Sequence, residues 1–134
     1  MASLVVDEIG FPAPAEGVPS FVAWYLEAIA TFLLAFTVLQ SATSSATDAN
    51  SFFGLAIGFV VTAMAVAVGG LSGGALNPAV GILGVVGAPG AASLGLAALY
   101  GSACPLGAVL AAVAYRVINV DEFSGGADIE YARK

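Results

Sequence analysis

The 134-residue chain contains no histidine and only one cysteine, Cys104. A single cysteine cannot form an internal disulfide, and the usual Cys/His metal sites have no ligand set without histidine. An axial histidine for haem is excluded for the same reason. We therefore expect neither a metal site nor a cofactor in this chain.

Basic residues are also scarce, with three Lys and Arg against nine Asp and Glu, which gives a net charge of -6. All three lie at or beyond the end of the last apolar segment: Arg116, Arg133 and Lys134. This balance excludes a nucleic-acid-binding surface and argues against electrostatic docking to anionic lipid. The first twenty residues contain acids and no base, which fits neither a secretory signal nor a transit peptide.

Apolar residues, in contrast, make up 60% of the chain, and the mean hydropathy is +1.00. No soluble domain of this length needs so much apolar surface, so we expect an integral membrane protein. Twenty helical residues cover about 30 Å, the thickness of the hydrocarbon core. Three segments are long enough to span a membrane: 21–40, 52–69 and 91–118.

A fourth apolar segment, 77–86, would form only about 15 Å of helix, half of the hydrocarbon core. Asn77 is a strong N-cap residue, and Pro78 suits the first helical position. Gly73 and Gly74 just before it allow sharp bends of the backbone. The sequence therefore predicts a half-helix that begins inside the membrane and presents its free amides there.

Polar flanks lie on either side of this apolar domain, which covers 21–118. Residues 1–20 contain three prolines and predict an extended arm, either a docking strand for a partner or a loose terminus. Residues 119–134 form an acidic tail. The sequence does not identify the membrane, although the alanine and glycine content and the acidic tail would suit an energy-transducing organelle.

Small residues recur four positions apart on two of the predicted spans. The pair Gly54 and Gly58 lies on the second span, and the pair Ala103 and Gly107 lies on the third. Such faces let membrane helices approach closely. We interpret them as helix-packing positions, and the pattern fits contacts inside the chain as well as contacts between subunits.

Three segments in the same order resemble the first repeat of the major intrinsic proteins, the aquaporins and glycerol facilitators. They are 27–36, with Glu27 and Thr31 four apart, 72–80, with Asn-Pro-Ala, and 100–108, with Cys104 where that family usually has Gln. The resemblance implies an all-α membrane protein with three transmembrane helices and one re-entrant half-helix, half of an aquaporin-like fold.

The same resemblance implies roles for several residues. Asn77, Pro78 and Ala79 would form the tip of the half-helix, where the asparagine amide meets the permeating solute. Glu27 would accept hydrogen bonds from the backbone leading into the half-helix, and Thr31 on the same helix face would be a second support of that loop. The alternatives for Glu27 are an interfacial carboxylate and an intramembrane proton carrier, and the re-entrant segment and third span argue against the carrier.

This chain departs from the family in having one repeat, whereas the family's pore lies between two. Val80 follows its Asn-Pro-Ala, as in first repeats, and nothing supplies the Arg or the His of the second repeat's filter. The bases at the C-terminal end weakly place that end inside, opposite to family first repeats. An antiparallel pair of copies would rebuild the inverted repeat.

Two functions fit these sequence features. The first is a non-enzymatic structural or assembly subunit of a larger membrane complex, which we favour because half a pore cannot conduct alone. The alternative is a half-channel that pairs with a second copy or another half to conduct water or small neutral solutes. The expected partners are the lipid bilayer and other membrane subunits, with no nucleic acid. No catalytic residues are expected, because histidine is absent and no acid pair shares a face.

Overall fold

The structure is a computed structural model that describes residues 11–87 and 91–123. Within these ranges all regular structure is helical. The elements are α2 (Ser20–Val38), a π turn (Leu39–Thr43), a 3-10 turn (Ser45–Thr47), α3 (Phe53–Ser72), α4 (Pro78–Gly87), α5 (Ala91–Ile118) and a second 3-10 turn (Val120–Glu122).

Three of these helices are long and apolar enough to cross a membrane, as the sequence predicts. They cover Ser20–Thr43, Phe53–Ser72 and Leu94–Ile118. The first is longer than expected because the π turn continues α2 by more than one turn. The structure is therefore compatible with an integral, all-helical membrane protein. The fourth helix, α4, has ten residues and is too short to cross.

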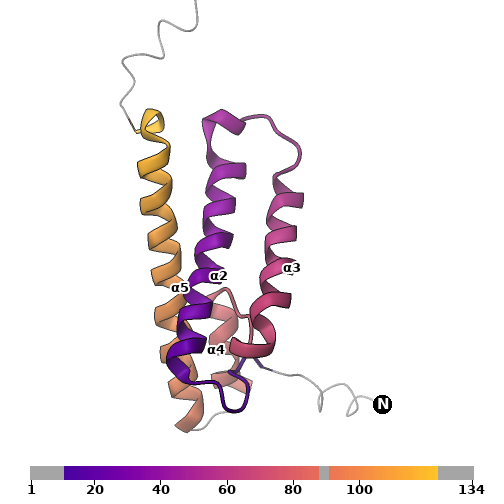
Figure 1. Ribbon diagram of the computed structural model, residues 1–134, viewed down its shortest axis with the longest axis vertical. Coiled ribbons are helices and arrows are strands. Elements are labelled where there is room, and N and C mark those ends of the chain that lie inside the picture. The colour runs from indigo at the N-terminus through magenta and orange to yellow at the C-terminus, as the bar shows by residue number, and fades with distance from the viewer. Residues whose placement is uncertain (1–10, 88–90, 124–134) are drawn as a thin grey trace, which may run out of the picture.

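The helix α2 lies at the centre of the bundle (Figure 1). It packs on α5 along one side and on α3 along the other, and α4 lies against α5 near the end of the bundle where α2 begins. In the described part of the chain, α3 packs mainly on α2. Only two residues of α3 are buried, Val68 and Ser72. Apart from the side that faces α2, the surface of α3 is therefore not covered by the described part of the chain.

The contact between α2 and α5 depends on small residues. Ala103 is fully buried, and a Cβ added to Gly107 would overlap the backbone oxygen of Ala28 on α2. The two helices therefore approach each other backbone to backbone. The equivalent pair on α3 differs, because a Cβ at Gly54 or Gly58 would meet nothing within 4 Å. These two glycines pack against no described residue, so their role between subunits stays a prediction.

The N-terminal arm, from residue 11 to the start of α2, runs across the turn between α3 and α4. The Ala15 amide donates to the Leu71 carbonyl at 3.0 Å. Ala13 lies so close to Gly73 that a Cβ there would touch its backbone nitrogen. This part of the arm packs within the chain. Residues 1–10 and most of the predicted tail, from 124 on, lie outside the described residues.

At the opposite end of the bundle, Glu122 joins the end of α5 to the loop after α2. One carboxylate oxygen, Oε1, accepts hydrogen bonds from the Ser44 hydroxyl at 2.7 Å, the Ser45 amide at 2.6 Å and the Ser45 hydroxyl at 3.0 Å. The Ser44 hydroxyl in particular holds the pKa of Glu122 below its usual range, and the two Ser45 donors add to this. In the same loop, Asn50 Oδ1 accepts hydrogen bonds from the amides of Phe52 and Phe53, at the start of α3.

Candidate functional site

Glu27 lies at the centre of a buried hydrogen-bond network that joins α2 to the turn before α4. It lies in the second turn of α2 with no solvent-exposed surface. Oε1 accepts hydrogen bonds from the Ser72 hydroxyl at 2.6 Å and the Ala75 amide at 3.0 Å, and Oε2 accepts one from the Leu76 amide at 2.9 Å. The contact implied by the resemblance, between Glu27 and the backbone leading into α4, is therefore present in the structure.

These hydrogen bonds explain how a carboxylate can be buried in an apolar helix. Hydrogen bonds to a charged group contribute about 1.5–3 kcal/mol each, and a buried charge without them is strongly unfavourable. The donors at Ala75 and Leu76 have no helical partner of their own, because they lie in the turn before α4. Glu27 and this turn thus satisfy each other.

The turn itself requires unusual backbone angles. Gly73 and Gly74 have φ values of 97° and 61°, which residues with a Cβ rarely adopt. Gly73 also ends α3 as its left-handed C-cap. The non-glycine Leu76 follows with φ of 51°, a costly conformation. The hydrogen bond from its amide to Glu27 and the burial of its side chain hold it there.

The buried side chain of Leu76 fixes the depth of the turn. It packs in a small apolar cluster with Ala30 of α2 and Val68 of α3. Partly buried side chains from the same two helices, including Leu34 and Met64, surround this cluster. The residue before the cap of α4 is therefore wedged between α2 and α3, well inside the bundle.

A second support for the turn comes from Tyr100 on α5, a fully buried residue. Its hydroxyl donates to the Ser72 carbonyl at 2.5 Å. A Cβ at Gly81 of α4 would overlap the Tyr100 side chain, so α4 packs directly on it. The sequence pattern does not predict this role for Tyr100. The residue stands out in the sequence only as the first of the 100–108 segment that resembles the family.

Asn77 is the N-cap residue of α4. Its side-chain Oδ1 accepts a hydrogen bond from the Ala79 amide at 2.9 Å, and its carbonyl accepts one from the Gly81 amide at 3.0 Å. Pro78 occupies the first helical position. Among the described residues, none accepts a hydrogen bond from Asn77 Nδ2, and the side chain is exposed. The tip of α4 therefore presents an oriented amide donor at the surface of this chain.

Thr31 does not support the turn, although its spacing from Glu27 predicts that it would. Its hydroxyl is buried and makes no hydrogen bond to the segment before α4. It lies instead beside the thiol of Cys104, which is fully buried on α5. Thr31 therefore belongs to the contact between α2 and α5, one helical turn after Glu27 along α2.

The hydrogen bonds of this arrangement position the turn before α4. No group of three or more Cys, Asp and Glu residues that could hold a metal ion occurs among the described residues. Glu27 is the one buried carboxylate among the described residues, and both of its oxygens accept hydrogen bonds. What remains open is the first turn of α4, with the exposed residues Asn77, Ala79 and Val80.

Comparison with family models, with curated proteins and with solved structures gives no match for this chain.

Proposed function

We propose that this protein is a non-enzymatic subunit of a membrane assembly, and that a second protein chain covers the tip of α4. The observation that carries this proposal is the exposed amide of Asn77, which has no acceptor among the described residues, at the start of a short helix that sits inside an apolar bundle. Three further arguments support it: the depth of the tip in the bundle, the free-energy cost of exposing the tip to lipid, and the exposed surface of α3.

The depth of the tip follows from its packing. Leu76 lies against Ala30, which is ten residues and so about 15 Å into α2 from Ser20. This is half of a hydrocarbon core about 30 Å thick. The start of α5 lies beside the start of α2, because Gly95 and Ser20 line one groove. These positions support a re-entrant α4, which begins near mid-membrane and returns to the side from which the chain entered.

A polar tip at that depth is unfavourable when it faces lipid. An amide without a hydrogen-bond partner costs several kcal/mol in hydrocarbon, roughly 4–8 kcal/mol by water-to-cyclohexane transfer. Neither α3 nor α5 covers Asn77, whose side chain is exposed in this chain. A neighbouring protein chain can supply an acceptor for Nδ2, or can enclose water that does so.

The exposed surface of α3 supports the same proposal. With Val68 and Ser72 as its only buried residues, α3 presents nearly its whole length to its surroundings, including Gly54 and Gly58. A glycine pair without any neighbour at its Cβ positions allows another helix to approach closely. The partner that we propose would thus contact α3 as well as the tip of α4.

The test is the size and composition of the assembly after gentle solubilisation. The tagged full-length chain is expressed in its own membrane, solubilised in mild detergent, and examined by native electrophoresis and mass spectrometry. We expect it to migrate with other proteins in fixed ratio. The variant Asn77→Ser, which keeps an N-cap oxygen and removes the amide, should weaken that association, while Asn50→Ser in the loop before α3 should not. Migration as a monomer alone would contradict the proposal.

A second function is supported by the orientation of the Asn77 amide. Because Oδ1 is held by the Ala79 amide, Nδ2 points away from α4. If two such tips face each other in a pair of chains, two helix N-termini and two amide donors line one passage. This arrangement favours water or small neutral solutes and repels cations. Each chain would then be a half-channel, and the two chains together would form the complete passage.

Swelling of vesicles that contain only this purified protein separates the two functions. A half-channel that pairs with itself raises water permeability above that of empty vesicles. Asn77→Asp keeps the cap oxygen but replaces the donor by a charge, so it should abolish the increase, whereas Asn50→Asp should preserve it. No increase with the unmodified chain would leave the subunit function and exclude self-paired conduction.

A further inference from the structure

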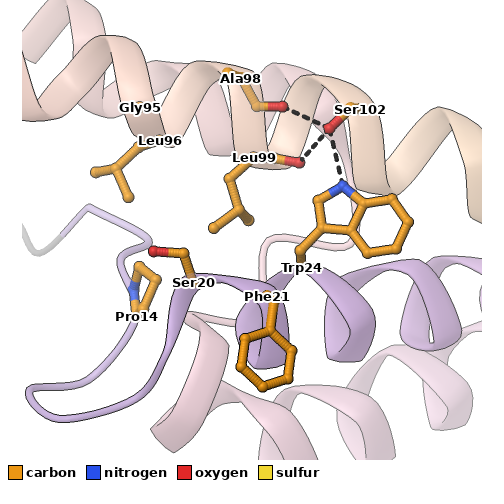
Figure 2. A pocket seen from close by; sticks show the side chains of 9 residues that line it. All are labelled: Pro14, Ser20, Phe21, Trp24, Gly95, Leu96, Ala98, Leu99 and Ser102. Atoms are coloured by element: carbon orange, nitrogen blue, oxygen red, sulfur yellow. Dashed lines mark hydrogen bonds between the residues drawn. The ribbon is translucent and has the colours of Figure 1, made fainter.

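A groove of about 470 Å³ lies between the first turns of α2 and α5, away from the tip of α4. Figure 2 shows Leu96 and Leu99 pointing from α5 toward α2, with Ser20 and Pro14 on the opposite wall. The indole nitrogen of Trp24 donates to the Ser102 hydroxyl at 2.9 Å and closes one end. The groove is in the size range of small-molecule sites, about 300–1,000 Å³.

We propose that this groove binds the glycerol backbone and upper acyl chain of one membrane lipid with an uncharged headgroup. This inference is independent of the proposed function, because neither Asn77 nor the open face of α3 contributes to the groove. Its support comes from three observations: depth in the membrane, distribution of polar groups, and charge.

The depth is that of the membrane interface. Ser20 is the first residue of the first candidate span, and Gly95 is the second residue of the third. Trp24 and the exposed Tyr25 lie one turn into α2, where aromatic side chains are enriched at the boundary of the hydrocarbon core. A groove at this level opens to the region where glycerol esters meet acyl chains.

The polar groups are placed for an amphipathic ligand. The walls formed by Leu96, Leu99 and Phe21 are apolar. The hydroxyl of Ser20 lies on the groove at the start of α2 and has no hydrogen-bond partner among the described residues. An ester carbonyl of a glycerolipid can accept from this hydroxyl while the acyl chain covers the leucines.

The charges at this end of the bundle favour an uncharged headgroup. Glu16 lies in the turn just before α2. The basic residue of the described part of the chain, Arg116, is in the last turn of α5, about 30 Å from Gly95 along the helix. Among the described residues, an anionic headgroup would therefore have a carboxylate close in sequence to the groove wall and no cation at this end of the bundle.

Trp24 provides the assay, because it is the only tryptophan of the chain. The purified full-length protein in detergent is titrated with diacylglycerol that carries brominated acyl chains, which quench tryptophan fluorescence on contact. Phosphatidylglycerol with the same brominated chains is the anionic comparison. We expect saturable quenching, with about two- to fivefold tighter binding of diacylglycerol, because the two lipids share their esters and differ in a charge at an exposed site.

Filling the groove should abolish this binding. A Cβ at Gly95 meets nothing within 4 Å, so Gly95→Leu can fit while occupying the space. The matched control is Gly101→Leu, because Gly101 lies on the same helix, also has free space and does not line the groove. We expect saturable quenching to disappear in the first variant and to persist in the second.

Three results would overturn the proposal. Equal, non-saturating quenching by both lipids in all variants would mean that Trp24 contacts only bulk lipid. Tighter binding of phosphatidylglycerol would exclude the uncharged headgroup. Fluorescence that neither lipid quenches would mean that protein, from a second copy or another partner, covers the groove.

Discussion

Replacing Glu27 by glutamine is expected to destabilise the fold through the turn before α4. The carboxylate is fully buried and accepts three hydrogen bonds, from the Ser72 hydroxyl and from the amides of Ala75 and Leu76. Glutamine has nearly the same shape, so the substitution changes the chemistry of these contacts and leaves the packing intact. One side-chain oxygen becomes an NH₂ group that donates and cannot accept.

The size of the effect follows from this exchange. At least one donor, for example the Leu76 amide, loses its acceptor and faces another donor, which costs about 1–3 kcal/mol. The remaining bonds weaken, because neutral hydrogen bonds contribute about 0.5–1.5 kcal/mol against about 1.5–3 kcal/mol for those to a charged group. Removing the charge from an apolar bundle offsets part of the loss. We therefore expect a net destabilisation of about 3 kcal/mol, roughly a hundredfold in the unfolding equilibrium.

The thiol of Cys104 provides the measurement. It is the only cysteine of the chain and is fully buried, so a maleimide dye that fluoresces on reaction labels it only when the bundle opens. In detergent, the labelling midpoint of Glu27→Gln should lie about 10 °C below that of the unmodified chain. Glu16→Gln is the control, because Glu16 is an exposed acid beside the same end of α2.

The reasoning would be refuted by a midpoint of Glu27→Gln within about 2 °C of the Glu16→Gln control. That result would mean that the three hydrogen bonds contribute no net stability over a neutral side chain. The turn before α4 would then be held by the packing of Leu76 and by Tyr100 alone.

Two further predictions concern the other contacts of α5. Gly107→Ala should lower the same labelling midpoint by an amount equivalent to about 1–3 kcal/mol, because the added Cβ overlaps the Ala28 carbonyl. Gly54→Ala, the control, should leave the midpoint unchanged or raise it slightly. Equal effects of the two variants would contradict the backbone contact between α2 and α5. The pKa of Glu122 is held low mainly by the Ser44 hydroxyl, so the loop contact should persist well below neutral pH and be lost only as the pH falls through that lowered pKa; a carboxyl carbon NMR titration with its midpoint at or above the usual range of glutamate would contradict this.

Much of the fold depends on local properties that the sequence displays directly. The three helices that are long and apolar enough to span a membrane follow from the length of the apolar segments, because a bilayer requires about that length. The start of α4 follows from Asn77 and Pro78, since an N-cap oxygen reaches amides only two or three residues away. The short length of α4 follows from the glycine and proline residues that flank the segment.

The contacts of α5, by contrast, could not be predicted from local pattern. Gly54 and Gly107 belong to similar small-residue pairs, yet only Gly107 lies against another helix of the chain. Thr31 has the spacing to support the turn beside Glu27, but its hydroxyl lies next to Cys104. Tyr100 carried no signal of its own, because its role depends on the position of Ser72 and α4.

The sequence by itself thus determined an all-helical chain with three helices long and apolar enough to span a membrane and one short helix capped by Asn77. These properties depend on the transfer of apolar segments out of water and on hydrogen bonds between near neighbours in the chain. Only the tertiary structure decided that Glu27 holds the turn, that Tyr100 supports it and that Asn77 remains open. These outcomes depend on which groups, 28 to 49 residues apart in sequence, meet in the folded bundle. The spacing of residues along one helix does not specify contacts between residues that lie so far apart in sequence.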